Sequence, residues 1–320
     1  MKHLAILLFS LAFSAQAVFA PSLFAQSSSA PSSSAQSSSA PFLAGVIDIH
    51  AHADPDDTSK RPRSIDVIAL AKLAKDRGMR GFVLKNHYES TASLAYVVRE
   101  AVPGIEVFGM IVLNRQVGGI NAAAVDYMIK AKGGYGRIVS MPTEDAENQV
   151  KYEGSNRPYV SIARNGQLLP EVREVLRMIA QNNLALATGH SSAAENLLLV
   201  REAKSLGVQK IIITHPLGRA VAMTIPQMQE AARQGAFLEI VTYERTTSNK
   251  PPITTKEHVD ALRGVGIEHF ILSTDTGQGG NPLHPDTLVT LFTALREQGF
   301  SQAEIDRMSK QNPATLLGLN

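Results

Sequence analysis

The 320-residue chain contains no cysteine, and its 31 basic and 29 acidic residues nearly cancel. Without cysteine the chain forms no disulfide and lacks the attachment point of a lipoprotein anchor. A net charge of +2 provides no concentrated positive surface, so nucleic acid is not an expected partner. After the N-terminal segment no apolar run approaches the length of a transmembrane helix, so we expect no stable membrane insertion.

The first 25 residues have the pattern of a secretory signal peptide. Lys2 precedes a largely apolar run at residues 4–13, and small residues follow at Ala17 and Ala25. The apolar run is too short to span a bilayer. We therefore expect residues 1–25 to be a signal peptide, cleaved after Ala17 or Ala25, and the protein to be periplasmic or secreted.

Residues 26–41 consist almost entirely of Ser, Ala and Pro. This composition has no apolar side chains to bury and predicts a flexible linker. The folded part is then residues 42–320, a length that suits one large domain such as a (β/α)8 barrel of about 250 residues.

Eight short apolar segments alternate with helical patterns along residues 42–320. Most of them are nearly continuous in apolar residues, which is typical of strands covered on both faces. The alternation predicts a parallel α/β fold, and eight units predict a single-domain (β/α)8 barrel of the TIM type. The predicted strands are residues 46–52, 81–87, 105–113, 137–141, 184–190, 210–215, 236–243 and 269–275.

The connecting segments carry helix signals. Residues 64–78, 285–297 and 301–310 are predicted helices, the last additional to the eight of the barrel. Capping boxes and C-terminal glycines mark other helix ends. The boxes begin at Ser192, Thr224, Thr254 and Ser301, and the glycines are Gly78, Gly207 and Gly235.

The connection after the fourth strand, residues 142–169, is much longer than an ordinary βα loop. Within it, Arg164-Asn165-Gly166 predicts a hairpin turn. An insertion on this side of a barrel is either a lid over the site or a surface elaboration, and both interpretations remain open.

Histidines gather at the carboxyl ends of the predicted strands, where a barrel builds its active site. Five of the nine histidines close a strand, and Asp275 ends the eighth. The i, i+2 spacing of His50 and His52 puts both imidazoles on one face of a regular strand, where they can bind a divalent metal. Taken alone, such a pair is equally typical of a half-exposed edge strand. The five strand-end histidines are His50, His52, His87, His190 and His215.

His-x-His on the first strand, His on the fifth and sixth, and Asp on the eighth resemble the metal-dependent amidohydrolase superfamily. The resemblance covers the chain from residue 46 to residue 319. Three phrases resemble a branch of that superfamily without an assigned substrate, namely Leu84-Lys85-Asn86-His87, residues 273–278, and Asn312-Pro313-Ala314.

The resemblance implies roles for these residues. His50, His52 and Asp275 would bind the first divalent ion, with zinc the expected metal. His190 and His215 would bind a second ion or hold the substrate. Asp275 would also orient the metal-activated water, accept its proton and pass that proton to the leaving group.

This chain departs from many two-metal members at the fourth strand, which ends without the lysine or glutamate that bridges the metals. Lys85, at the end of the second strand, is a candidate substitute if it is carboxylated. Otherwise Lys85 is a cationic clamp for substrate beside a single metal.

Other polar residues near the strand ends have less specific signals. His87, Asn114 and His284 are candidate substrate-binding residues. His87 can equally be a hydrogen-bonding loop residue, and His284 can equally cap the eighth helix. Glu239 lies inside the seventh predicted strand, where a buried carboxylate needs a partner. It either supports the metal ligands or forms a structural ion pair.

The preferred function is a metal-dependent hydrolase acting on an amide, lactone or ester. The alternatives are a phosphoesterase related to phosphotriesterases, a mononuclear decarboxylase, and an exported binding protein that keeps the metal without turnover. The substrate is expected to be a small molecule. The substrate identity, the number of metal ions and the oligomeric state stay open.

Overall fold

The computed structural model describes residues 43–57, 62–242 and 252–319. All of them belong to one compact unit, Ser38–Asn320. The predicted signal peptide and linker lie outside the described residues. Within the described part of the chain, no helix is both long and apolar enough to cross a membrane.

Eight parallel strands form the central sheet, in the order β1-β2-β3-β4-β7-β8-β9-β10. A parallel bridge between Ala51 and Thr276 brings the first and last strands together, so the sheet is a nearly closed barrel. This confirms the predicted (β/α)8 fold. The strands are β1 (Ile47–Ala51), β2 (Gly81–Leu84), β3 (Glu106–Val112), β4 (Gly136–Ser140), β7 (Ala185–Ala187), β8 (Lys210–Ile213), β9 (Phe237–Val241) and β10 (Phe270–Ser273).

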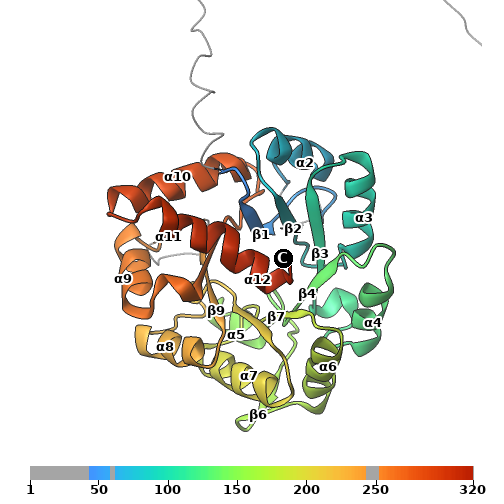
Figure 1. Cartoon of the computed structure of the whole chain (residues 1–320). Helices are drawn as coiled ribbons and strands as arrows, with labels where there is room; N and C mark the ends of the chain where they lie inside the picture. Colours follow the sequence, from blue (N-terminus) through green and yellow to red (C-terminus); the bar gives the residue numbers. More distant parts are fainter. Residues whose placement is uncertain (1–42, 58–61, 243–251, 320) are drawn as a thin grey trace, which may run out of the picture. The chain divides into compact units, whose positions relative to one another are not determined.

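Helices surround the barrel, as Figure 1 shows along its axis. They are α2 (Val67–Asp76), α3 (Ala92–Ala101), α4 (Ala122–Lys130), α5 (Glu147–Tyr152), α6 (Pro170–Gln181), α7 (Ala193–Ser205), α8 (Ile225–Arg233), α9 (Thr255–Val265), α10 (His284–Glu297), α11 (Gln302–Asp306) and α12 (Asn312–Leu317). Short 3-10 turns lie at Arg115–Val117 and Ile267–His269.

The predicted helix ends are confirmed. All four capping boxes form, with the Ser or Thr side chain and the Glu or Gln side chain each accepting from the other residue's backbone N–H. The three glycines follow the ends of α2, α7 and α8 with positive φ angles. The additional helix differs from the prediction, because α11 passes through a π-helical turn, Arg307–Gln311, into α12. Pro313 lacks the N–H that would continue the α-helical hydrogen bonds there.

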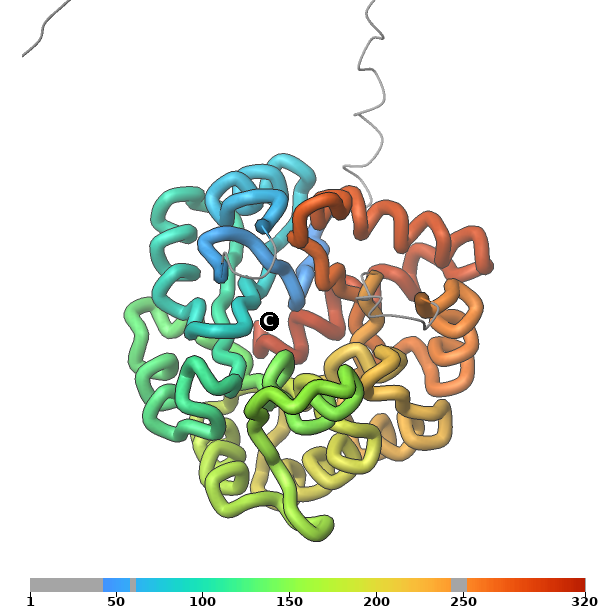
Figure 2. Tube along the Cα trace, turned by 180° about the vertical axis from the view of Figure 1, so that it is seen from behind, coloured from blue at the N-terminus to red at the C-terminus, as the bar shows by residue number. Residues whose placement is uncertain are grey.

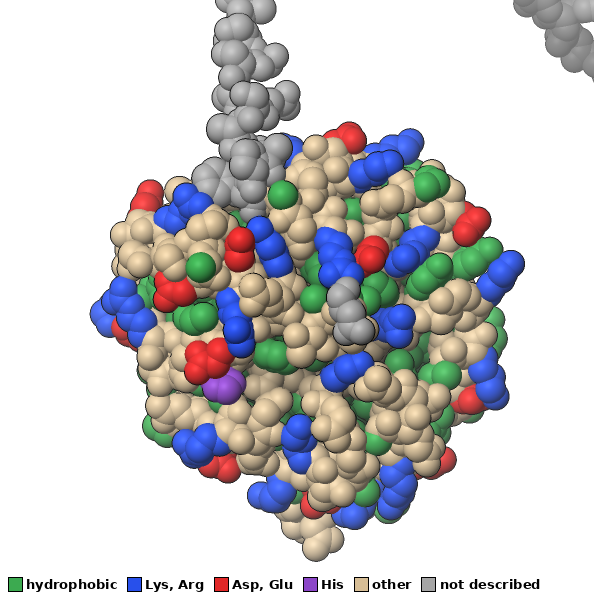
Figure 3. Space-filling model, viewed as in Figure 1, with side chains coloured by type: hydrophobic (Ala, Val, Ile, Leu, Met, Phe, Trp, Pro, Cys, Tyr) green, Lys and Arg blue, Asp and Glu red, His purple; other side chains and the backbone are tan. Residues whose placement is uncertain are grey.

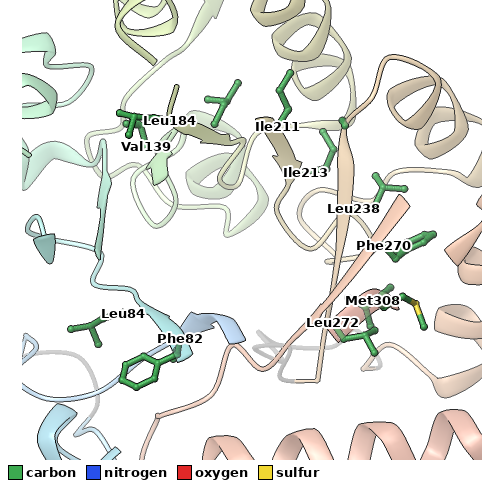
Figure 4. Packing of buried hydrophobic residues seen from close by; sticks show 14 of the residues in the cluster. Phe82, Leu84, Val139, Leu184, Ile211, Ile213, Leu238, Phe270, Leu272 and Met308 are labelled. Atoms are coloured by element: carbon green, nitrogen blue, oxygen red, sulfur yellow. The ribbon is translucent and has the colours of Figure 1, made fainter. Parts of the chain in front are cut away.

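Two layers of buried apolar side chains stabilise the barrel. The larger layer lies between the strands and the surrounding helices, and Figure 4 shows residues of it from β2, β4, β8, β9 and β10. The smaller layer takes alternate residues of the strands, including Val83, Phe108 and Ile271, and therefore fills the barrel interior. Leu316 and Leu317 of α12 join this inner layer. In Figure 1, α12 lies across the middle of the barrel, at the end that faces the viewer.

The insertion after β4 contains the predicted hairpin. Strands β5 (Ala163–Arg164) and β6 (Gln167–Leu168) pair antiparallel. Asn165 and Gly166 have positive φ angles, as a two-residue hairpin turn requires. Helix α5 precedes the hairpin. Figure 2, viewed from the end opposite to α12, shows this part of the chain in front of the barrel.

The face that carries α12 has no large area of one charge. Figure 3 shows Lys and Arg side chains interspersed with Asp and Glu across it. This distribution agrees with the small net charge of +2.

Candidate metal centre

The structure brings the five strand-end histidines and Asp275 together at the carboxyl ends of the strands. The imidazoles form a row in which neighbouring ring centroids are 5.0 to 6.1 Å apart. The order along the row is His87, His52, His50, His215 and His190. Residues more than 160 positions apart in the sequence thus meet in one site.

Three ligand atoms converge on one another within this row. Asp275 Oδ1 lies 2.9 Å from His50 Nε2 and 3.1 Å from His52 Nε2. The three ligand atoms all lie within 4.8 Å of one another. The second carboxylate oxygen, Asp275 Oδ2, is 4.0 Å from His215 Nε2.

A β-bulge in β1 aims His50 into the barrel. Asp48 pairs with Phe82 and Ala51 pairs with Leu84, so β1 has two residues where β2 has one. Ile49 belongs to the inner apolar layer and Ala51 to the outer one. In a regular strand His50 would face outward, opposite to Ile49. The extra residue lets His50 face inward beside Ile49, and bulges often re-aim a side chain next to an active site in this way.

Asp48 fastens the bulge to β10. Its Oδ1 accepts hydrogen bonds from the backbone N–H groups of His50, at 3.0 Å, and Thr274, at 3.2 Å. Its Oδ2 accepts from the Thr274 hydroxyl at 2.7 Å, and Asp48 is completely buried. Thr274 immediately precedes Asp275, so this carboxylate joins the two strands that carry the three converging ligands.

The backbone around Asp275 packs closely against the backbone of His50 and His52. Asp275 has a φ of 53°, and its N–H donates to the His50 carbonyl at 2.9 Å. Gly277 has a φ of 123°, and a Cβ there would lie 1.9 Å from the His52 carbonyl oxygen. Only glycine fits this approach, which keeps the segment after β10 against the His52 backbone.

Glu239 fixes the ring of His50. His50 Nδ1 lies 3.0 Å from Glu239 Oε1, and Glu239 Oε2 accepts from the His215 backbone N–H at 3.2 Å. With Nδ1–H donating to Glu239, the Nε2 lone pair of His50 is available to a metal. Of the two roles considered for Glu239, its contacts match support of the metal ligands.

His50 and Lys85 share one proton in the metal-free site. Burial lowers the pKa of His50, but the negative charges of Asp275 and Glu239 outweigh it and raise that pKa to about 9. Burial lowers the pKa of Lys85, although the same two carboxylates oppose the shift. Lys85 Nζ lies 2.7 Å from His50 Nε2, a hydrogen-bond distance that two cations would not hold. One of the two groups is therefore neutral.

The other histidines of the row favour the neutral form, which is the form that binds metals. Burial lowers the pKa of His52 to about 3. Burial also lowers the pKa of His190, and of His215 to a lesser degree. The Nδ1 atoms of all three are buried and have no hydrogen-bond partner among the described residues. Burial would raise the pKa of Asp275, but His50 and His52 hold it well below its usual range.

These features fit a bound divalent ion. Two imidazole nitrogens and one carboxylate oxygen are the ligand types that zinc prefers. Their separations of about 3 Å are those of atoms that share one ion at about 2 Å from each. The carboxylate behind His50 completes the support that metal-bound histidines usually have.

His87 stands at one end of the row, and Asn114 supports its backbone. His87 stacks on His52, and its Nδ1 is 2.8 Å from Thr143 Oγ1. Asn114 is completely buried and donates to the His87 carbonyl and to Thr143. It also accepts from the N–H groups of Thr143 and Asp145. Asn114 therefore positions the loops after β2, β3 and β4, and the predicted direct contact with substrate does not match its burial.

His284 is buried at the start of α10. It is the first residue of α10 and is 1 % exposed, and its pKa is lowered by burial. Among the charges that act on its pKa, the negative charge of Asp48 has the largest effect and opposes the lowering. The predicted cap is not present, because Leu283 is the N-cap residue of α10 and no side chain caps this helix.

The insertion after β4 contacts the rim of the site. Asn148 Nδ2 donates to the carbonyl oxygens of His190, at 3.0 Å, and Ala220, at 2.8 Å. Arg157 pairs with Asp145 at 2.8 Å, within the same insertion. The strand-end pattern of the sequence does not include Asn148, Thr143 or Asp48, because none of them closes a predicted strand.

A cavity of about 130 Å³ adjoins the centre. His215 and Glu239 border it on one side, and most of its remaining walls are apolar. The other lining residues are Leu217, Gly218, Ile240, Val241, Thr242, Pro252, Ile253 and His258.

Comparison with known families identifies the chain. A family of unknown function (DUF6282) has a model that matches residues 45–239, more than half of the sequence. The chain belongs to this family. The matched region runs from the start of β1 into β9 and includes every ligand candidate except Asp275. A search of curated proteins finds no match for this DUF6282 member.

Solved structures share its fold at low sequence identity. The probable dipeptidase PvdM from Pseudomonas aeruginosa matches with a TM-score of 0.59 and 13 % identity, over 88 % of this chain and 96 % of that one. An amidohydrolase from Burkholderia multivorans with bound zinc matches at 0.58 and 11 %, over 87 % and 100 %. The phosphotriesterase homology protein from Escherichia coli, with phosphate in its active site, matches at 0.56 and 17 %, over 86 % and 99 %. At these identities the likeness shows the fold.

Proposed function

We propose that this protein is a metal-dependent hydrolase in which His50, His52 and Asp275 bind a divalent ion. The observation that supports this most directly is the convergence of His50 Nε2, His52 Nε2 and Asp275 Oδ1 at the carboxyl ends of the strands. The amidohydrolase fold, shared with the structures above, makes hydrolysis the leading reaction class.

An ion bound there would lower the pKa of a coordinated water and polarise the bond under attack. The two oxygens of Asp275 then have different tasks. Oδ1 faces the two histidines, whereas Oδ2 is directed toward His215 at 4.0 Å and is placed to accept the proton of the attacking water. The same oxygen returns that proton to the leaving group.

Lys85, His190 and His215 complete the site in this proposal. With one ion bound, Lys85 remains a cation that draws a substrate oxygen toward the metal, and the two histidines contact the substrate. The alternative is a second ion on His190 and His215 with Lys85 carboxylated as the bridge.

The proposed substrate is a small molecule with an amide, lactone or ester bond, and the proposed metal is zinc. The dipeptidase and amidohydrolase names of the structural relatives agree with a carbonyl substrate, whereas the phosphotriesterase homology protein makes a phosphoester the second candidate. The signal-peptide pattern of residues 1–25 leads us to propose that the enzyme acts in the periplasm or outside the cell.

The test is metal analysis together with turnover of a substrate panel. Protein purified without chelator is analysed for metal per chain and is then assayed with dipeptides, lactones, p-nitrophenyl acetate and p-nitrophenyl phosphate. Asp275→Asn should lower kcat by at least about a thousandfold, as the loss of a general base and ligand implies. Asp286→Asn, which alters an exposed ion pair with Arg77, is the matched control.

The outcomes separate the candidates. Turnover of a carbonyl substrate that Asp275→Asn abolishes supports the hydrolase. Turnover of the phosphate ester alone supports the phosphoesterase. Metal without turnover of any hydrolysable bond points to a decarboxylase or a binding protein, and protein that takes up no metal contradicts the proposal.

A further inference from the structure

His87 is the member of the imidazole row for which no ligand role follows from the geometry. It comes three residues after β2 and stacks on His52, with ring centroids 5.0 Å apart. Its Nδ1 is 2.8 Å from Thr143 Oγ1. Which of these two groups donates decides what the other ring nitrogen can do.

The Asn114 amide settles the direction of this hydrogen bond. Asn114 Oδ1 accepts from two backbone N–H groups, those of Thr143 at 2.8 Å and Asp145 at 3.2 Å. The amide therefore cannot be reversed, because its NH₂ group would then face two donors. In the fixed orientation Asn114 Nδ2 donates to the His87 carbonyl and to Thr143 Oγ1, each at 2.9 Å.

The orientation of the Asn114 amide determines the direction of the hydrogen bond between Thr143 and His87. Its oxygen already accepts from Asn114, and its side chain is completely buried. Among the described residues the only other hydrogen-bond partner of that hydroxyl is His87 Nδ1. A buried hydroxyl hydrogen needs an acceptor, so the Thr143 O–H donates to Nδ1.

The ring proton of His87 then lies on Nε2. No hydrogen bond to Nε2 is present in the described part of the chain, and this nitrogen is not among the buried polar atoms that lack a partner. It is thus open to a ligand. From this network we infer that His87 Nε2–H is a fixed hydrogen-bond donor to a carbonyl or phosphoryl oxygen of the bound substrate, and is not a metal ligand.

The inference rests on the proposed function, and it gives His87 a catalytic task. A donor held in place before the reaction stabilises negative charge as it develops on a substrate oxygen. Such a donor typically contributes about 100- to 1000-fold to kcat. Asn114 and Thr143 are positioning residues, because they act through the ring of His87.

The tautomer can be measured without any substrate. Long-range ¹H–¹⁵N correlation spectra of the full chain, at neutral pH and without metal, distinguish a protonated Nε2 from a protonated Nδ1. His87→Gln identifies the His87 signals. We expect the Nε2–H form in the native protein and in Thr143→Ser, which keeps the hydroxyl. In Thr143→Val, which replaces the hydroxyl by a methyl group, the preference should weaken or reverse. A native protein with the proton on Nδ1 would overturn the inference while leaving the proposed hydrolase intact.

Two substitutions at His87 test the task itself. Gln places an amide N–H near the position of Nε2, whereas Phe keeps a ring without a donor. With zinc-loaded protein and p-nitrophenyl acetate as the probe, His87→Phe should lower kcat about 100-fold or more with KM little changed. His87→Gln should recover part of that loss.

Zinc binding supplies the remaining control. Both variants should bind as much zinc per chain as the native protein, since the proposed donor is not a ligand. Loss of zinc from His87→Phe, or unchanged kcat in that variant, would contradict the inference. If the native protein hydrolyses none of the panel, the proposed function fails, and the tautomer and zinc measurements still decide whether His87 is a donor or a ligand.

Discussion

Glu239 Oε1 lies 3.0 Å from Nδ1 of His50, on the side of the ring away from the ligand cluster. Both residues are 3 % exposed, so water does not compete strongly for this contact. The carboxylate holds one proton on Nδ1, so that Nε2 is the nitrogen that can bind a metal together with Asp275 Oδ1. Glu239, which is 189 positions away in the sequence, thus orients His50 as a candidate metal ligand.

Replacing this carboxylate should weaken metal binding. In Glu239→Gln, an amide can accept from His50 Nδ1 with its oxygen, but its NH₂ group then faces the His215 backbone N–H, which is also a donor. We expect a 10- to 100-fold loss of zinc affinity, the usual effect of losing such a supporting carboxylate. Competition with a chromogenic zinc indicator measures it. Glu106→Gln, at the far end of β3 in a half-exposed pair with Arg80, should bind zinc like the native protein.

Asp48 should determine how firmly the ligands of β1 and β10 are held. Asp48→Ala leaves the N–H groups of His50 and Thr274 buried without an acceptor, which should cost about 2–5 kcal/mol of the free energy of unfolding. Asp48→Asn keeps an oxygen for both N–H groups and turns an NH₂ group toward the Thr274 hydroxyl, which can rotate to accept. Urea unfolding of metal-free protein should therefore rank Asn well above Ala. Equal stability of the two variants would show that the carboxylate does not fasten the bulge.

The sequence was sufficient to predict the barrel, because parallel strands that are covered on both faces appear in the sequence as short apolar segments. It also identified the side chains that meet in the candidate metal centre, since the carboxyl ends of parallel strands meet at one end of a barrel whatever lies between them. His190 and Asp275 could thus be joined across 85 residues without any knowledge of side-chain contacts.

There is a physical reason why the contacts that support the ligand cluster could not be predicted from the sequence. The bulge in β1 is one extra residue relative to β2, and such a difference exists only in the pairing of two strands. Asp48 is buried in β1, but its partner Thr274 is 226 positions away in the sequence. Thr143 carries no distinctive sequence signal, because threonines are common in loops.

Lys85 provides a direct test of how many ions the site holds. Its Nζ is 2.7 Å from His50 Nε2, so an unmodified ammonium competes with a metal for the same lone pair. Two like unit charges about 4 Å apart repel by about 4 kcal/mol at an effective dielectric constant of 20. With one ion per chain, Lys85→Met should therefore raise zinc affinity at neutral pH by at least about tenfold.

The carboxylated bridge predicts the opposite result. Lys85→Met would then lower the metal content from two ions to one, and the native protein would need bicarbonate to bind the second. Lys130→Met, which removes an exposed lysine paired with Asp126, controls for the loss of charge. Isothermal titration with zinc, with and without bicarbonate, distinguishes the two arrangements.

Acid should destabilise the metal-free protein through its neutral, buried histidines. The pKa of His52 is about 3 in the folded state and about 6.5 in the unfolded chain, so the unfolded chain binds the extra proton between these values. Stability is therefore fully present above pH 6.5 and is lost as the pH falls. From pH 6.5 to pH 5 the loss is about 2 kcal/mol for His52 alone. The lowered pKa values of His87, His190 and His215 add losses of the same sign.

Urea unfolding with a chelator present, measured from pH 7.5 to pH 5, should show this steep loss. His52→Gln removes one of the titrating groups and should reduce the slope by about 1.4 kcal/mol per pH unit. His258→Gln is the matched comparison, because burial lowers the pKa of His258 to about 4 and this residue lies on α9, outside the ligand cluster. Both variants should flatten the pH dependence, but only His52→Gln should also weaken zinc binding. A native protein whose stability is constant between pH 6.5 and pH 5 would show that its histidines take up protons as readily in the folded state as in the unfolded chain, which contradicts the lowered pKa values.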